Sequence, residues 1–481
     1  MNRRVFTLAI MLFGMVVASA NAQDAASPES DAATPLTLDE VLSASAKFFP
    51  AILEAEANRR EALGEITVAA GGFDTLVQAE SSSYASGFYD GQAAKGTITQ
   101  PLRAFGTNIY GEYKVSEGDF PIYEDINFTN RGGTAKAGVI LSLLRDRDID
   151  DRRFAEVNAG LAVREADLDL LLTQIEVQRD AAQAYWRWRA AGQTLTVYRD
   201  LLRNAQERDA ALIREVSSGA RAEIFLTENQ QIITRRKSLV ASSQARFMLA
   251  ANQLSFYLRD DAGLPKLPTD DRLPGGMEAL PGVVPRALDS AAEVLNARPE
   301  LMRLENQIRR AGNRLQLRKN ALKPRFDVSL ELASGIGGVG EGGVSRDSTD
   351  TIFGLKFSVP IQRRQAQGRV DQARAELDAL QLRRQQVEER IALELQGIVL
   401  GLTFAEQVAD LAANDVVLSQ KLELAEIERF RNGASDFFLV NLREQTVAQA
   451  QIREISARLD ARVAEVNFDA GTLNLRNLAL E

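Results

Sequence analysis

One stretch of the sequence joins two kinds of structure, and it constrains the fold more than any other. Residues 325–334 alternate apolar and polar side chains, and residues 351–360 do the same after a gap rich in Gly, Ser and Asp. A period of two places the apolar side chains on one face of a β-strand. From residue 362 the apolar period becomes helical and continues to about residue 431. The pattern predicts a β-hairpin that leads directly into a very long helix.

The two predicted strands have a length that suits a bilayer, because a tilted transmembrane strand needs ~9–11 residues. We expect one face of the hairpin to meet lipid, formed by Phe326, Val328, Leu330, Leu332, Phe353, Leu355, Phe357 and Val359. Barrel-strand signals are weak in single segments. An amphipathic hairpin on a soluble domain is therefore the competing interpretation of this stretch alone.

The N-terminus favours the membrane interpretation. Two arginines and an apolar segment precede a small-residue cleavage site that ends at Ala22. This order is typical of a secretory signal peptide, which we assign to residues 1–22, with a flexible leader at 23–36. We expect no transmembrane helix after residue 22, because no later apolar run approaches the required length.

The composition disfavours several classes of function. The chain has no Cys and no His, so it lacks disulfides, thiol chemistry and the commonest general base and metal ligand. Its net charge of −9 disfavours nucleic acid as a partner. It has no phosphate-binding loop of the GxxxxGK[ST] type. We predict no catalytic residue, no cofactor and no bound metal, and we keep a carboxylate-based hydrolase as a minor alternative.

The sequence repeats one plan of helix, strands, long helix, glycine turn and shorter helix. We assign the two repeats to residues 37–259 and 286–473, because a period of this size has to be recognised before a fold is assigned. A proline-rich linker at 260–285 separates them, and residues 474–481 form a tail.

The longest helices predicted are residues 145–213, which follow strands within about 73–144, and residues 362–431. Their apolar side chains recur at steps of three, four and seven, which is the spacing of a coiled-coil seam. At 1.5 Å per residue each helix would extend about 100 Å. A plain coiled coil is the competing interpretation, which the signal peptide and the hairpins disfavour.

These features together resemble the outer-membrane efflux protein family, the TolC-like trimeric channels, over residues 38–473. The resemblance rests on short motifs in a fixed order: Arg298-Pro-Glu-Leu301, Pro324-Arg-Phe326, Val359-Pro-Ile361, and the turns at Gly219 and Gly433. The resemblance implies an α+β membrane protein in which three chains share a twelve-stranded β-barrel. A helical coiled-coil barrel would continue it across the periplasm, belted by an equatorial domain that includes the linker.

The resemblance also implies a function, a location and partners. The chain would be the outer-membrane exit duct of a tripartite efflux or type I secretion system in a Gram-negative bacterium. It would be a passive conduit served by a periplasmic membrane-fusion adaptor and an inner-membrane pump, whether proton-driven or ATP-driven. Independently, two hairpins cannot close a barrel, and lipid does not tolerate open sheet edges, so several chains must share it. A periplasmic structural coiled coil is the alternative function.

One segment departs from the family's pattern. The region from residue 73 to 144 is longer than the usual hairpin and holds an extra strand-like pair near residues 97–115. The pair would be either a raised extracellular hairpin or two added barrel strands. We favour the former, because the polar residues 119–131 that follow include a proline.

Two sets of candidate site residues follow from the resemblance. The adaptor is expected to dock on the helical tips, at Gly219, Ala220, Arg221, Gly433, Ala434 and Ser435. The candidates for an acidic ring at the pore constriction are Asp436, Glu444, Glu223 and Glu228. Helix capping by Asp436 is the simpler alternative for that residue.

Overall fold

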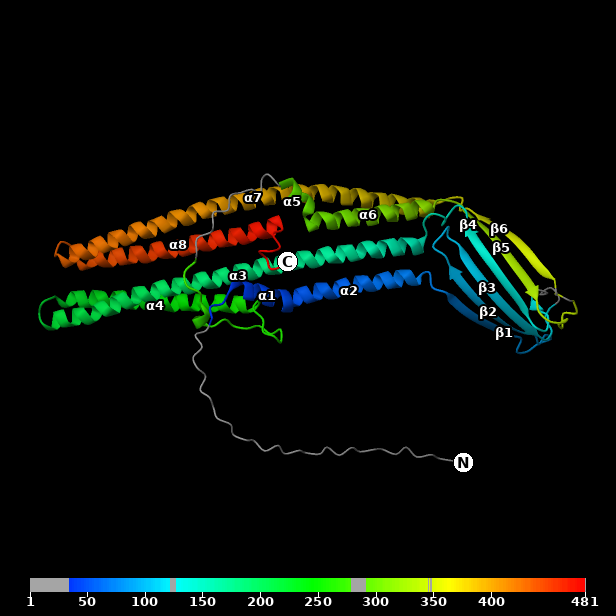
Figure 1. The fold of residues 1–481 in the computed structure, drawn as a ribbon, viewed down its shortest axis with the longest axis horizontal. Coiled ribbons are helices and arrows are strands. Elements are labelled where there is room, and N and C mark those ends of the chain that lie inside the picture. The colour runs from blue at the N-terminus through cyan, green and yellow to red at the C-terminus, as the bar shows by residue number, and fades with distance from the viewer. Residues whose placement is uncertain (1–33, 122–126, 278–290, 345, 347, 481) are drawn as a thin grey trace, which may run out of the picture.

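The computed structural model describes residues 34–121, 127–277, 291–344, 346 and 348–480. The signal peptide, most of the leader and the end of the linker therefore lie outside the described residues. The described chain is a long rod of helices with a curved six-stranded sheet at one end (Figure 1).

Two helices run the length of the rod. Helix α3, Asp151–Ser217, has 67 residues, and helix α7, Arg364–Arg431, has 68. At 1.5 Å per residue each is about 100 Å long. The start of α3 is fixed by Asp150, whose side chain accepts a hydrogen bond from the backbone N–H of Arg153 at 2.8 Å.

Shorter helices lie beside these two in pairs (Figure 1). Helices α2, Pro50–Gly71, and α4, Glu223–Ser255, lie one after the other along α3. Helices α6, Pro299–Asn320, and α8, Phe437–Thr472, do the same along α7 and also contact α3. The rod is therefore a ribbon four helices wide, in the order α2-α3-α6-α7 near the sheet and α4-α3-α8-α7 toward the tip.

The largest apolar core lies about halfway along the rod, where α1, Leu38–Phe48, packs against α3 and side chains of α4 and α8 join the cluster. Trp188 of α3 is completely buried in it. The linker is attached to this level, because the guanidinium of Arg272 donates two hydrogen bonds to the carboxylate of Glu40, at 3.0 and 2.6 Å. The hydrogen bond from Arg272 lowers the pKa of Glu40.

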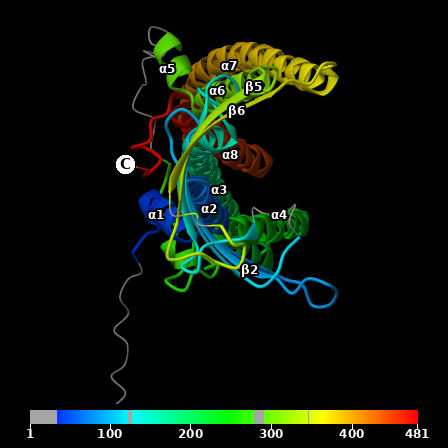
Figure 2. The ribbon, with the colours of Figure 1, turned by 90° about the vertical axis from the view of Figure 1, so that its right-hand side faces the viewer.

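The sheet contains six antiparallel strands in chain order, so each strand pairs with the next. The strands are β1 Leu76–Ser83, β2 Gln92–Pro101, β3 Asn108–Glu117, β4 Thr134–Ser142, β5 Arg325–Gly335 and β6 Thr349–Ser358. The two halves of the chain join where β4 pairs with β5, with Val139 opposite Leu330. Seen from the sheet end, the sheet and the helices follow one open arc (Figure 2).

The extra strand pair near residues 97–115 is part of the sheet, and our preference for a raised extracellular hairpin is wrong. Strand β2 pairs with β1 from Gln92 to Thr99, and β3 pairs with β2 along its whole length. The error has a clear cause, because residues 119–131 lie in the sequence after β3 and before β4. The polarity of that loop carries no information about the strands before it.

The expectation that no later stretch is as apolar as a membrane-spanning helix is wrong for α7, judged by length and composition only. Among the described residues, α7 has a window with a mean hydropathy of 1.3, and 22% of that window is buried. Composition of this kind is also found in the core helices of soluble proteins. The exposed part of α7 is therefore a feature that the function has to explain.

Candidate functional site: an amphipathic sheet and a charged helical tip

The sheet has one continuous apolar face across all six strands. Because β-strand side chains alternate, residues paired in register share a face. The residues of this face include Val77, Ile98, Ile109, Val139, Leu141, Phe326, Val328, Leu330, Leu332, Phe353, Leu355 and Phe357. All the residues predicted to face lipid in β5 and β6 lie on it, while Val359 follows the end of β6. The face is exposed, with Phe353 at 66%.

The opposite face of the sheet is polar and carries ion pairs between strands. The ammonium of Lys136 lies 3.8 Å from the carboxylate of Glu112 and 3.4 Å from that of Glu331. Lys95 pairs with Glu80 at 2.9 Å. A sheet with one exposed apolar face and one charged face fits a boundary between lipid and water.

The far end of the rod consists of two turns with the same geometry. Gly219 follows the end of α3 and Gly433 follows the end of α7, and both have φ of +74°. The next residue returns a backbone hydrogen bond in each turn, Ala220 N–H to Glu215 at 2.9 Å and Ala434 N–H to Arg429 at 2.8 Å. These are Schellman caps. They require one residue in the left-handed conformation, which glycine adopts without strain.

Side chains connect the two turns within one chain. The rings of Phe225 and Phe437 meet edge to face, with centroids 6.4 Å apart. The guanidinium of Arg221 lies 5.3 Å from the Phe225 ring and 5.9 Å from the Phe430 ring. Arg221 was predicted as a docking residue, and here it joins the two helical hairpins.

Just behind the tip, a cluster of charges is buried between the helices. Glu444 in α8 is only 6% exposed, and its carboxylate pairs with two guanidinium groups. One is Arg208 of α3, and the other is Arg236 of α4, at 3.1 Å. Arg236 also donates to the backbone carbonyl of Leu201 at 2.5 Å. A buried carboxylate that binds arginines from two helices fixes the relative position of three helices.

A second acid, Glu423 of α7, completes this cluster. Burial raises its pKa above the usual 4.5, and the nearby Glu444 carboxylate adds to the rise while Arg208 opposes it. A raised pKa in the folded state means that the folded tip binds this proton more tightly than the unfolded chain does. The proton therefore stabilises the tip at low pH, and this contribution is lost as the pH rises through the folded-state pKa.

The structure places the predicted acids in different environments. Asp436 is the N-cap of α8 and accepts a hydrogen bond from the Leu439 N–H at 2.8 Å. This confirms the helix-capping alternative for Asp436. Glu223 and Glu228 are exposed on α4. Glu444 is buried and paired, so its position does not match a residue that lines a pore. Lining of a pore by the other three stays a prediction.

The predicted docking residues are largely accessible. Gly219, Ala220, Gly433 and Ala434 are exposed. The Ser435 hydroxyl donates a hydrogen bond to the buried carboxylate of Glu426. Ser435 therefore has a structural role inside the tip.

Sequence reasoning did not find Arg208 and Arg236, which hold the buried acid. Both lie in long helices rich in arginine, where a charged side chain is normally solvated. The only available signal was their place on the seam between helices. The chain offers many such arginines, so the sequence could not select these two.

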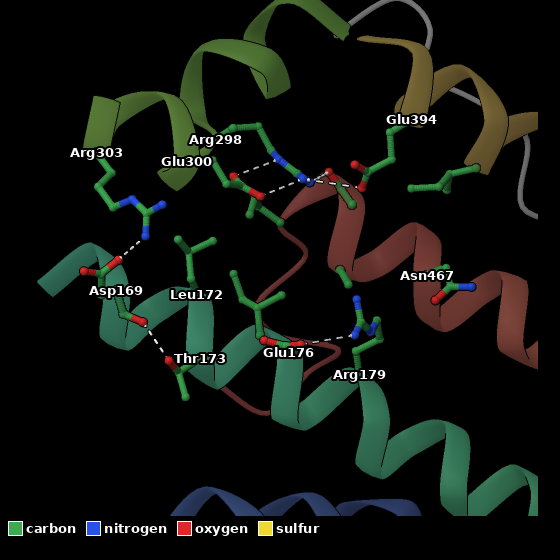
Figure 3. A pocket seen from close by; sticks show the side chains of 15 residues that line it. Asp169, Leu172, Thr173, Glu176, Arg179, Arg298, Glu300, Arg303, Glu394 and Asn467 are labelled. Carbon is green, nitrogen blue, oxygen red and sulfur yellow. Dashed lines mark hydrogen bonds and ion pairs between the residues drawn. The ribbon is translucent and has the colours of Figure 1, made fainter. Parts of the chain in front are cut away.

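A cavity of about 800 Å³ lies where α3, α6, α7 and the end of α8 meet (Figure 3). Its charged side chains are paired with one another. Arg303 reaches Asp169 at 2.6 Å, and Arg298 reaches Glu300 at 2.9 Å and Glu394 at 3.5 Å (Figure 3).

The motif that begins the second repeat has a structural role, which its first residue, Arg298, performs. Its buried guanidinium also donates to the backbone carbonyl of Gly471 at 2.8 Å, near the C-terminus of α8. A cation is favourable there, because the last carbonyls of a helix carry partial negative charge. We interpret this cavity as a junction between helices. Among the described residues, no group of three or more acidic side chains is placed to hold a metal ion.

The fold is that of the TolC-like outer-membrane channels, and the resemblance inferred from the short motifs is confirmed at this level. The outer-membrane channel OprN is 17% identical, with a TM-score of 0.63 over 95% of this chain and 98% of that one. The MtrE outer-membrane channel of Neisseria gonorrhoeae, in its open state, is 14% identical, with a TM-score of 0.64 over 90% and 88% of the chains.

A third channel agrees with these two. The CmeC outer-membrane channel of Campylobacter jejuni is 13% identical, with a TM-score of 0.62 over 97% of each chain. The sequence itself matches no family model and no curated protein. At these identities the comparison establishes the fold, and those proteins are described as channels rather than enzymes.

Proposed function

We propose that this protein is an outer-membrane channel, formed by three copies, that serves as the exit duct of a tripartite efflux or type I secretion system. The observation that carries the proposal is the sheet. It exposes a continuous apolar face, keeps ion pairs on the other face, and continues into a helical rod about 100 Å long. The apolar face meets outer-membrane lipid, and the rod extends into the periplasm.

The edges of the sheet support assembly from several copies. In the described chain, β1 and β6 each pair on one side only. Unpaired backbone groups at a sheet edge are not tolerated in hydrocarbon. Single-chain barrels have at least about eight strands, so six strands do not close by themselves.

Helix α7 provides independent support, because it is apolar on two opposite faces. One face is buried within the chain, at Ile391, Leu395, Val399 and Leu402. The other is exposed, with steps of seven and four residues, at Leu393, Leu400, Phe404, Leu411 and Leu418. Leu411 is 69% exposed. Since α7 and α4 are the two outer helices of the ribbon toward the tip, we propose that α7 of one copy packs on α4 of the next there.

The helical tips fit the proposed contact with a periplasmic adaptor. Both turns leave backbone and small side chains exposed, at Gly219, Ala220, Gly433 and Ala434. The chain has no phosphate-binding loop, so an inner-membrane pump must supply the energy. The protein itself acts as a passive conduit, and the pump selects the cargo.

The location and orientation can be tested with single cysteines, because the chain has none of its own. Phe88 lies in the loop between β1 and β2 and is 93% exposed, and Ala434 lies at the opposite end. We expect a large, impermeant maleimide to label Phe88→Cys in intact cells. It should label Ala434→Cys only after the outer membrane is permeabilised. Equal labelling of both in intact cells would contradict the proposed orientation.

Asp436 provides a test of the pore entrance. Three copies would bring three Asp436 carboxylates toward one axis, where like charges attract cations. Asn caps helices about as well as Asp, so Asp436→Asn should keep the fold. We expect the variant to show lower cation selectivity and weaker block by a trivalent cation in planar bilayers. Unchanged selectivity and unchanged block would exclude Asp436 from the pore lining.

A further inference from the structure

The six strands raise a question that the helical rod helps to answer, which is how wide the shared barrel is. Strands β2 and β3 form an antiparallel hairpin within the sheet. Its residues continue the pattern of the whole sheet, with Ile98 and Ile109 on the apolar face and Lys95 and Glu112 on the polar face. These two strands therefore present the same surfaces to lipid and to water as β5 and β6 do.

The turn between β2 and β3 lies at the helical end of the sheet and is held there. The Arg103 guanidinium pairs with Glu156 of α3 at 2.9 Å and lies 4.6 Å from the ring of Phe73. On the strand itself, the Asn108 side chain accepts a hydrogen bond from Arg152 at 3.2 Å. The hairpin is thus anchored to the rod and does not project beyond the sheet.

The backbone of this turn also approaches the segment between β4 and α3 too closely for a larger residue. Gly106 has φ of +59°, and a Cβ built on it would lie 2.4 Å from the Asp146 carbonyl oxygen. Both the conformation and the space therefore require glycine. The turn between β2 and β3 therefore packs closely against the segment that joins β4 to α3.

The widths of the two parts of one copy can be compared. Four helices side by side, at ~8–10 Å between axes, are about 32–40 Å wide. Six strands spaced ~4.8 Å apart and tilted by ~40° occupy about 38 Å of circumference, whereas four strands would occupy only about 25 Å. At this tilt six strands therefore match the width of the helical ribbon, whereas four strands would match it only with a steeper tilt.

We propose that the added hairpin widens the membrane barrel to eighteen strands, six from each of three copies, so that its circumference equals that of the helical tube. The number of copies rests on the proposed function. An even number of strands per copy lets each seam between β6 and the next β1 be antiparallel, like all other pairs in the sheet. The barrel would be about 36 Å across, against roughly 24 Å for twelve strands. The membrane barrel would then be as wide as the helical tube, so it would not restrict the size of the cargo further.

The proposal can be tested by pairs of cysteines in the protein reconstituted in lipid nanodiscs. A disulfide needs Cα atoms about 4.4–6.8 Å apart, so only neighbouring strands can be linked. The register predicts links within one copy for Val77→Cys with Ile98→Cys, and for Ile109→Cys with Val139→Cys. The pair Ala79→Cys and Gly96→Cys is a second choice, because the space around Gly96 is open.

The seam between copies is tested in the same way. We combine Ala79→Cys of β1 with a cysteine at one of four positions on the apolar face of β6: Thr351, Phe353, Leu355 or Phe357. One position or two adjacent positions should link, and native mass spectrometry should show covalent species of up to three copies. Ala79→Cys with Ile352→Cys, which lie on opposite faces, is the control that should not link.

The outcomes separate this inference from the proposed function. A disulfide between Val77→Cys and Val139→Cys would place β1 beside β4 and overturn the eighteen-stranded barrel. A linked ring of two copies would overturn it too, since it would contain twelve strands. A conducting trimer with the Val77–Val139 link would contradict only the wider barrel. A monomer that conducts no ions would contradict the channel itself.

Discussion

Replacing Leu330 or Phe353 with Arg is expected to prevent assembly of the barrel. The two residues are paired between β5 and β6 on the exposed apolar face. A cation near mid-bilayer on the lipid face of a barrel costs ~2–4 kcal/mol. Three copies would each carry this cost. We expect the trimer fraction in detergent, measured by equilibrium sedimentation, and the amount of protein in the outer membrane both to fall at least tenfold.

Ile352→Arg is the matched control, because Ile352 is adjacent to Phe353 and lies on the opposite face. Its partner in the register is Glu331, so the new cation would lie beside a carboxylate on the wet side. We expect this variant to assemble like the parent. If all three variants assembled equally, or all failed equally, the apolar face of the sheet would not be the lipid face.

The second large effect is expected from Glu444→Leu. This change leaves the Arg208 and Arg236 guanidinium groups without the buried carboxylate that pairs them. Removing one partner of a buried ion pair costs about 3–5 kcal/mol. The loss should appear as local opening of the tip, so that amide hydrogen exchange in α8 and in the facing parts of α3 and α4 accelerates by about 10²–10⁴-fold.

Two variants make this test specific. Glu228→Gln removes an exposed carboxylate from α4 and should leave the exchange rates unchanged. The double variant Glu444→Leu with Arg236→Met removes one charge of each sign and should recover part of the protection, since Arg208 still has Glu423 nearby. Parent-like exchange in Glu444→Leu would mean that the cluster does not hold the helices together.

Much of the fold could be predicted because the signals were periodic. Alternation located β5 and β6, which form at Arg325–Gly335 and Thr349–Ser358. The heptad spacing located the two long helices. The place of β2 and β3 was missed, since β2 contains Lys95, Gly96, Thr97 and Thr99 and lacks the clean alternation of β5. Only the pairing with β1 shows that its weak apolar side belongs to the common face.

The candidate site was harder to predict than the fold, for a physical reason. The chain has 66 acidic and 57 basic side chains. Pairing among them depends on which helices are neighbours, and spacing along one helix does not contain that information. Glu444 was thus chosen as a pore residue, although two helices that precede it by more than 200 residues neutralise it. The glycine turns were found correctly, because their signal is local.

The central claim is that this chain forms a continuous channel, and conductance of the purified protein in a planar lipid bilayer tests it most directly. We predict stepwise ion currents from the parent and from Ile352→Arg, and none from Phe353→Arg added at the same concentration. A purified, membrane-inserted protein that carries no current, either as the parent or as the Glu444→Leu variant with its opened tip, would contradict the account. It would instead favour a structural coiled coil of the cell envelope.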